Sequence, residues 1–196
     1  MSLALWPANI TQDYEVHEWR HATAILHTAF PQEFADIAQV LSAFRLHRSM
    51  VMTPGGQKST ISRGLDSAFY SRGWTERKFA TGIVVDGNAT ATPTHKVDCF
   101  KNSVAFEIEW NNKTEFYDRD LNNFRLLFEL RVVSVGVILT RASHLQATFD
   151  RLGKGSSYGM STTHMDKLVP RVFGGGAGGC PVVVFGITDR LYDDHL

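Results

Sequence analysis

Three acidic residues between positions 98 and 109 form the part of the sequence with the clearest chemical potential. Glu107 and Glu109 are two positions apart, and Asp98 precedes Glu107 by nine. Residues two apart on a strand project to the same face, so the two glutamates are expected side by side. Asp98 lies on Lys96–Phe100, a segment that can pair with the glutamate strand through a turn near Lys101. The sequence therefore predicts that three carboxylates converge.

Converging carboxylates repel one another, and one of them would keep its proton unless a cation is present. Ligand sets made only of oxygen favour Mg²⁺, Mn²⁺ or Ca²⁺ over zinc. A metal held in this way polarises a phosphate, lowers the pKa of a bound water and neutralises developing charge. The chemistry indicated is phosphodiester hydrolysis. An exposed strand face, with acids that pair with Lys or Arg, is the alternative that the residues alone leave open.

The elements needed to position these acids are also visible in the sequence. Residues Ser103–Trp110 alternate, with apolar side chains on one face and Ala105, Glu107 and Glu109 on the other. The β-branched runs Val132–Leu139 and Pro181–Ile187 are typical of strands buried on both faces. Helices are expected at Gln32–Arg48, at Asp118–Leu130, at Thr162–Leu168, and over a short segment capped by Ser62 and closed by Gly73. The expected class is α/β, with a central mixed β-sheet flanked by α-helices.

Composition narrows the class of protein further. The 196 residues are 43% hydrophobic, which suits one domain over residues 1–196. The formal net charge of zero disfavours a free-standing nonspecific nucleic-acid binder, which would usually be basic. A protein with no net charge can still present a basic cleft. The two cysteines, Cys99 and Cys180, have no zinc spacing and no disulfide framework, so buried thiols are expected. Without a signal peptide or a long apolar run, we expect a cytoplasmic protein with no membrane contact.

The segment from Val97 to Trp110 resembles the Asp…Glu-x-Gln centre of the BglII and BstYI type II restriction endonucleases, a family in the PD-(D/E)-x-K nuclease superfamily. The interval from Asp98 to Glu107 is the same as in that family. Likeness extends over roughly Ile61–Thr188 at low identity; Leu65–Glu76 is similar to the upstream helix and turn, and Cys180–Ile187 to the closing strand. The resemblance implies a restriction-endonuclease-like fold that hydrolyses double-stranded DNA with Mg²⁺.

The resemblance also implies roles for individual residues. Asp98 and Glu107 take the metal-ligand positions, and the backbone carbonyl of Ile108 is a further ligand. Glu109 departs from the pattern, because the family carries Gln there and the superfamily usually Lys. A glutamate at this position is similar to the Glu-x-Glu centre of BamHI and suits general-base help to the attacking water. Whether one or two metal ions act stays open.

Polar residues in two segments are the candidates for DNA contacts. One segment directly follows the catalytic strand, where Asn side chains can bond adenine bidentately, and a polar strand-end turn is the alternative. The other is similar to a Ser-rich loop that reads bases in the family, and an ordinary surface loop is the alternative. The candidates are Asn111, Asn112, Lys154, Ser156, Ser157 and Tyr158.

The resemblance implies a palindromic target of six bases centred on GATC and cut to leave 5′ overhangs. A palindrome is most simply read by a two-fold homodimer. The apolar stripe of helix Asp118–Leu130 is a candidate dimer element, unless it packs on its own sheet. The implied functional partner is a DNA methyltransferase that protects the host's own sites.

Three other functions stay open at this point. One is a DNA repair or junction nuclease of the same superfamily, with the same acids and a different target. Another is a non-catalytic DNA-binding protein on a nuclease fold. The last is a small-molecule metallohydrolase, which is disfavoured because Gly174–Gly179 lacks the Lys-Ser/Thr of a P-loop.

Overall fold

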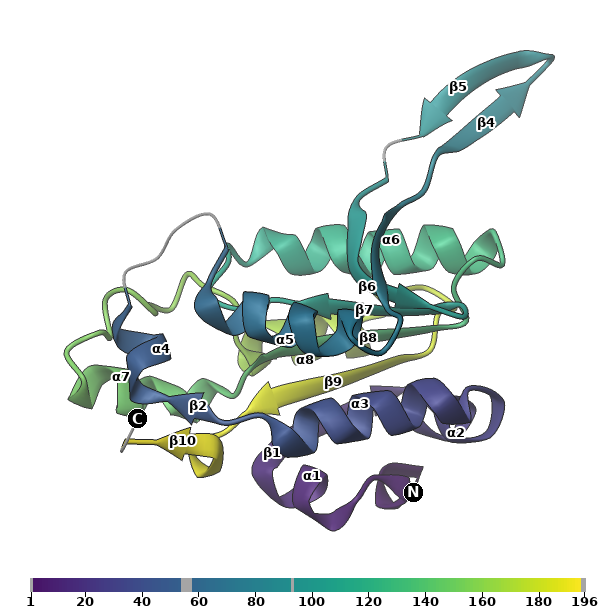
Figure 1. The fold of residues 1–196 in the computed structure, drawn as a ribbon. Coiled ribbons are helices and arrows are strands. Elements are labelled where there is room, and N and C mark those ends of the chain that lie inside the picture. The colour runs from purple at the N-terminus through teal and green to yellow at the C-terminus, as the bar shows by residue number, and fades with distance from the viewer. Residues whose placement is uncertain (1, 54–57, 93, 195–196) are drawn as a thin grey trace.

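A mixed β-sheet organises the chain, as the computed structural model of residues 2–53, 58–92 and 94–194 shows (Figure 1). Among these residues, six strands pair in the order β1-β9-β8-β7-β6-β3. They are β1 (Tyr14–Trp19), β3 (Thr75–Lys78), β6 (Lys96–Lys101), β7 (Val104–Ile108), β8 (Val135–Arg141) and β9 (Val182–Ile187). The fold is of the α/β class, with a mixed central sheet, as the sequence predicts.

The centre of the sheet is parallel and its borders are antiparallel. Strands β7, β8 and β9 run parallel, with Glu107 opposite Ile138 and Ile138 opposite Val184. Strands β1 and β6 pair antiparallel on either side of this centre. Every residue of β7, β8 and β9 is buried, which explains the unbroken apolar character of β8 and β9.

One face of the sheet is covered by helices from the first half of the chain and by one later helix. These are α1 (Ala8–Asp13), α2 (Ala22–Ala29), α3 (Pro31–Ala43), α5 (Thr60–Tyr70) and α7 (Gln146–Arg151). Their apolar side chains share a core with Val104, Phe106 and Ile108 of β7. The alternation expected for this strand is therefore present, and its apolar face is fully packed.

Two helices cover the opposite face, α6 (Glu115–Glu129) and α8 (Met165–Phe173). Leu121, Phe124 and Leu127 of α6 are buried against Ala105 of β7 and Ile138 of β8. Gly136 of β8 makes this contact possible, because a Cβ there would lie 2.4 Å from the Phe124 ring. The apolar stripe of α6 therefore packs on its own sheet and is not a free dimer face.

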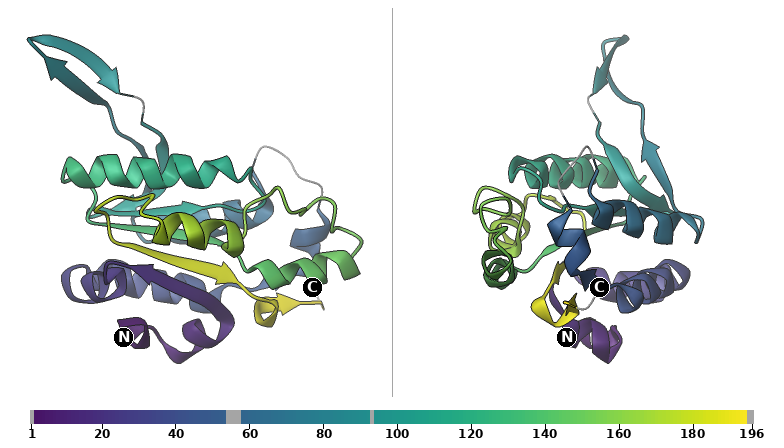
Figure 2. Two further views of the ribbon diagram at one scale, coloured as in Figure 1. Left: turned by 180° about the vertical axis from the view of Figure 1, so that it is seen from behind. Right: turned by 60° about the vertical axis from the view of Figure 1, so that its left-hand side comes forward.

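A two-stranded hairpin, β4 (Thr81–Val85) with β5 (Asn88–Thr92), stands away from this body (Figures 1 and 2). It joins β3 to β6, so it interrupts the chain between the helix α5 and the strand that carries Asp98. The short elements that complete the described chain are η1 (Ser2–Leu5), β2 (Leu46–His47), α4 (Arg48–Met52), η2 (Ser143–Leu145), η3 (Asp189–Leu191) and β10 (Tyr192–Asp193).

Several expected boundaries are displaced. The helix predicted at Gln32–Arg48 ends at Ala43, and the next helical turn begins at Arg48. Ser62 is not the cap of α5; Ser59 is, and its hydroxyl accepts a hydrogen bond from the Ser62 backbone N–H. The helix expected at Thr162–Leu168 begins at Met165 instead. The run Pro54-Gly55-Gly56 predicts a loop over Thr53–Ser59, and part of that segment lies outside the described residues.

Both cysteines are buried free thiols, as expected. No helix in the described part of the chain is both long and apolar enough to span a membrane.

Candidate active site

The candidate site begins where β6 and β7 separate. The two strands pair from Lys101 opposite Val104 to Cys99 opposite Phe106, and the pairing stops at Asp98. Beyond this point, side-chain carboxylates accept hydrogen bonds from backbone N–H groups of the neighbouring strand. Glu107 Oε2 accepts from the Asp98 N–H at 3.1 Å, and Asp98 Oδ2 accepts from the Ile108 N–H at 3.0 Å. The expected meeting of Asp98 and Glu107 is therefore present, and each acid fixes the other's strand.

Glu107 is the most deeply buried acid of this pair, with 1% of its surface exposed. Its Oε1 atom has no hydrogen-bond partner among the described residues. Burial raises the pKa of Glu107 well above its ordinary value, and the neighbouring Asp120 and Asp98 carboxylates raise it further. A buried carboxylate with an unpartnered oxygen is costly unless a cation or a proton satisfies it.

Glu109 makes a separate set of contacts. Its Oε1 lies 3.1 Å from Nη2 of Arg119 on α6, and its Oε2 accepts from the Asn112 amide at 2.7 Å. Arg119 also pairs with the fully buried Asp120 at 2.8 Å. Burial, followed by the charge of Asp120, raises the pKa of Glu109 to about 9. The third predicted acid therefore lies just beyond the end of β7 and is engaged by helix α6.

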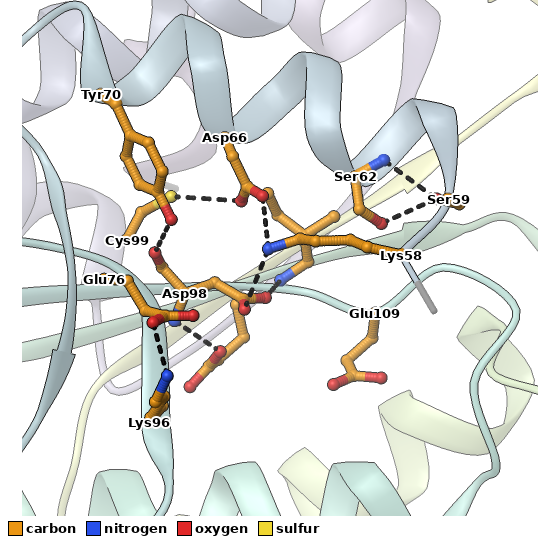
Figure 3. Close-up of polar contacts among 12 residues, drawn as sticks. Lys58, Ser59, Ser62, Asp66, Tyr70, Glu76, Lys96, Asp98, Cys99 and Glu109 are labelled. Carbon is orange, nitrogen blue, oxygen red and sulfur yellow. Dashed lines mark hydrogen bonds and ion pairs between the residues drawn. The ribbon is translucent and has the colours of Figure 1, made fainter. Parts of the chain in front are cut away.

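Helix α5 supplies the opposite wall of the site (Figure 3). Ser62, Asp66 and Tyr70 recur at four-residue steps and share one face of the helix. The Tyr70 hydroxyl donates to the Asp98 backbone carbonyl at 3.1 Å. The buried Asp66 carboxylate contacts Lys58 Nζ, and burial raises the pKa of Asp66 although Lys58 opposes the rise. Lys58 Nζ lies 3.9 Å from Asp98 Oδ1.

A cleft of about 960 Å³ opens over these residues. Asp98, Ile108 and Glu109 lie on its wall, and Lys58 and His95 lie on it as well. Five of the six residues expected to contact DNA also line it, namely Asn111, Asn112, Lys154, Ser157 and Tyr158. Ser156 is exposed and is not among the residues that line this cleft. Most of the predicted site residues therefore lie around one opening, although Glu107 and Ser156 do not line it.

The residues predicted to contact DNA differ in exposure and in the contacts that they already make within the chain. The Asn111 side-chain oxygen is shielded and has no partner among the described residues. Asn112 is already committed, because its side chain binds Glu109 and its backbone N–H binds the Thr163 hydroxyl at 3.1 Å. The Tyr158 ring stacks on Phe149 at 4.1 Å and is 7% exposed, so it anchors the loop in the core.

Sequence reasoning missed four residues of this site: Lys58, Asp66, Arg119 as an ion-pair partner, and Asp120. Two of them carried a signal in the sequence. Asp66 and Asp120 each lie within the apolar stripe of a helix, beside Leu65 and Leu121. An acid on a buried helix face is expensive without a partner, which marks it as a candidate for a site.

The donor set is consistent with a divalent cation bound by two carboxylates. Among the described residues, no group of three or more His, Cys, Asp or Glu side chains is arranged to hold a metal ion, so the predicted convergence of three carboxylates on one metal is not found. Asp98 and Glu107 are in contact, and Glu107 keeps an unpartnered buried oxygen. With the Ile108 carbonyl as a third oxygen, these are the hard ligands that Mg²⁺ prefers, and Mg²⁺ usually retains water molecules as well.

Comparison with known proteins agrees with this geometry. The family model for the restriction endonucleases BglII and BglIII matches residues 14–187, which is nearly the whole chain. The chain belongs to the BglII family of restriction endonucleases. A search among curated proteins gave no match. The family match spans the strand that carries Glu107, both flanking helix layers and the closing strand β9, so family membership concerns the whole sheet and not the acidic motif alone.

Proposed function

We propose that the chain is a type II restriction endonuclease that uses Mg²⁺ to hydrolyse double-stranded DNA at a palindromic site. The observation that carries this proposal is the contact between Asp98 and Glu107, with one unpartnered glutamate oxygen, beside a cleft in a chain of the BglII family. A target centred on GATC and cut to leave 5′ overhangs is the specific form of the proposal, and it rests on the family resemblance.

Asp98, Glu107 and the Ile108 backbone carbonyl would hold the metal ion. When bound, Mg²⁺ polarises the phosphate and lowers the pKa of a bound water. Asp98 also orients Ile108 through the hydrogen bond to its backbone N–H at 3.0 Å. The burial of Glu107 keeps this part of the site away from bulk water, which strengthens electrostatic interactions there.

Glu109 is the proposed acceptor of the proton that the attacking water loses. Its pKa of about 9 means that the carboxyl holds a proton at neutral pH when no further positive charge is present. Arg119 already lowers this pKa, so the carboxyl can act as a base only if further positive charge in the site lowers it more. Arg119, 3.1 Å away, is the protein cation in direct contact, so it is a positioning residue for Glu109.

The proposed DNA contacts come from the cleft wall. Asn111 lines the cleft and is a candidate to read a base edge, although its side-chain oxygen is shielded in the absence of DNA. Lys154, Ser156 and Ser157 suit contacts with phosphates and groove edges. Asn112 and Tyr158 would contribute indirectly, by fixing the conformation of the segments around them. Asn112 donates a hydrogen bond to Glu109, and Tyr158 packs on Phe149.

A two-fold homodimer remains the proposed assembly, because two equivalent strands of a palindrome are cut by two equivalent sites. Its interface lies elsewhere than the apolar stripe of α6, which is buried within the chain. A DNA methyltransferase in the same system is the proposed functional partner that protects host DNA. Cytoplasmic residence follows from that role.

The test is digestion of unmethylated λ DNA by the purified chain with Mg²⁺, followed by sequencing of the fragment ends. Discrete fragments with identical ends and 5′ overhangs are expected. Glu107→Ala serves as the inactive comparison, and Glu129→Ala, on the exposed end of α6, as the matched control. A smear without fixed ends would indicate a repair or junction nuclease. The absence of cutting by the wild type with any divalent ion would refute the nuclease proposal.

A further inference from the structure

Lys58 is a cation of the site that lies outside the acidic motif. It precedes Ser59, the N-cap residue of α5, and lies on the wall of the cleft, where 38% of its side chain is exposed. Its ammonium contacts the Asp66 carboxylate and lies 3.9 Å from Asp98 Oδ1 (Figure 3). Asp66, in contrast, is 7% exposed at its side chain. The acid is therefore a buried anchor, and the lysine is the part of the pair that a ligand in the cleft can reach.

Arg119 and Lys58 contact different acids of the site. Arg119 pairs with Glu109 and Asp120. Within residues 2–53, 58–92 and 94–194, Lys58 is the cation that lies within 4.0 Å of Asp98. Asp98 and Lys58 are held by the same helix, since Tyr70 of α5 donates to the Asp98 carbonyl. Helix α5 thus fixes the position of this ammonium relative to the carboxylate pair.

Among the described residues, the Lys58 ammonium contacts fewer acceptors than it has N–H donors. It carries three N–H groups, and its contact with Asp66 uses one of them. At 3.9 Å, the approach to Asp98 is too long for a hydrogen bond. Burial disfavours the charged form of Lys58, but the hydrogen bond with Asp66 and the charge of Asp98 outweigh it and raise the pKa. A cation with free donors, beside the acids and open to a cleft, suits a phosphate oxygen.

We propose that Lys58 is a catalytic residue that binds a non-bridging oxygen of the phosphate being cut, and that Asp66 is the residue that positions it. This inference rests on the proposed function. As the water oxygen bonds to phosphorus and the bond to the leaving oxygen breaks, negative charge grows on the non-bridging oxygens, and a fixed ammonium stabilises it. The proton lost by the water passes to Glu109, as proposed above, the leaving oxygen gains a proton from a solvent water, and Lys58 keeps its own proton.

The variants that test this role are Lys58→Ala, Lys58→Met, Lys58→Arg and Asp66→Asn. Lys58→Met keeps the length of the side chain, so it decides the outcome if the alanine variant does not fold. Lys96→Ala is the matched control, because Lys96 is also an ion-paired lysine near the site, 2.7 Å from the exposed Glu76. For each protein, three quantities are measured: the melting temperature, the Kd of a duplex carrying the mapped site in EDTA, and the single-turnover cleavage rate in Mg²⁺.

Loss of Lys58 should slow single-turnover cleavage by about 100-fold or more, the size found when one donor to a developing charge is removed. The Kd should change much less than the rate, Lys58→Arg should restore part of the rate, and Asp66→Asn should slow cleavage by a smaller factor. Lys96→Ala should cut like the wild type.

Two results with an active wild type would overturn the role of Lys58. One is a weaker Kd with an unchanged single-turnover rate, which would make Lys58 a simple backbone anchor. The other is a fall in melting temperature with an unchanged rate per folded molecule, which would make it a structural clamp on α5. If the wild type itself cuts no DNA, the proposed function fails first, and the inference fails with it.

Discussion

Replacing Glu107 by glutamine should stabilise the metal-free protein while it abolishes cleavage. Glutamine has nearly the same size as glutamate, and its side-chain oxygen can still accept from the Asp98 N–H. The substitution removes a charge that burial, Asp120 and Asp98 all oppose. An unsatisfied buried polar group costs about 1–3 kcal/mol and a charged one more, so the neutral amide costs less than the carboxylate, and we take a difference of about 1–3 kcal/mol. At pH 8 we expect a gain of that size in the free energy of unfolding, which is roughly 4–8 °C in melting temperature for a gain near the middle of that range.

The gain should depend on pH with a definite sign. The pKa of Glu107 is raised in the folded state above its ordinary value of 4.5. The folded protein therefore binds this proton more tightly than the unfolded chain, and the stability that follows is present below pH 4.5 and lost as pH rises. Wild-type stability in EDTA should fall from acid toward alkaline pH, whereas Glu107→Gln should fall less. The two proteins should have similar stabilities at pH 4.5.

Thermal and urea unfolding in EDTA, at pH 4.5, 6 and 8, measure this difference. Glu76→Gln is the matched control, because Glu76 is an exposed acid paired with Lys96, and it should shift stability by no more than about 0.5 kcal/mol. Mg²⁺ should then stabilise the wild type and not the Gln variant, by an amount that grows with metal concentration. A Glu107→Gln protein that is less stable than the wild type at pH 8 would refute the reasoning, since the carboxylate would then be a favourable structural group.

Three further predictions concern the same elements. Arg119→Ala should lower stability by about 1–3 kcal/mol, because the buried Glu109 and Asp120 lose their shared cation; an unchanged midpoint in urea unfolding would contradict this. Gly136→Ala should cost about 1–3 kcal/mol through overlap with Phe124, and Gly64→Ala, where a Cβ meets nothing within 4 Å, is its control; an unchanged urea midpoint for Gly136→Ala would show that the ring moves freely. Ca²⁺ should support binding of the target duplex in fluorescence anisotropy without supporting cleavage, since it accepts a looser coordination than Mg²⁺; equal cleavage rates in the two ions would count against the proposed ligands.

The sequence predicts the central part of this site because the relevant contacts are local. Alternation along Ser103–Trp110 gives the face on which Glu107 lies, and one short turn brings Asp98 beside it. The buried strands β8 and β9 are visible from composition alone. These features depend on periodicity and on near neighbours in the chain, which a single sequence contains.

The rest of the site depends on contacts that no local pattern encodes. Lys58 and Asp66 precede the β4–β5 hairpin in the sequence, whereas Asp98 follows it. Asp66 contacts Lys58, and Lys58 lies 3.9 Å from Asp98. Strand alternation places Glu109 on the same face as Glu107 but does not predict that Glu109 forms an ion pair with Arg119 of α6. Tyr158 is in a polar Ser-rich loop, and its ring is nevertheless held in the core by Phe149. Each of these outcomes is decided by tertiary packing.

The central claim is that Asp98 and Glu107 carry the chemistry of a DNA-cutting site while other residues provide DNA binding. The most direct measurement compares the wild type with Asp98→Asn on one duplex that contains the mapped target, with binding followed by anisotropy in Ca²⁺ and cleavage by single turnover in Mg²⁺. Asp98→Asn is expected to bind the duplex nearly as well as the wild type and not to cut it. An Asp98→Asn protein that cuts at a rate close to that of the wild type would show that Asp98 does not carry the chemistry.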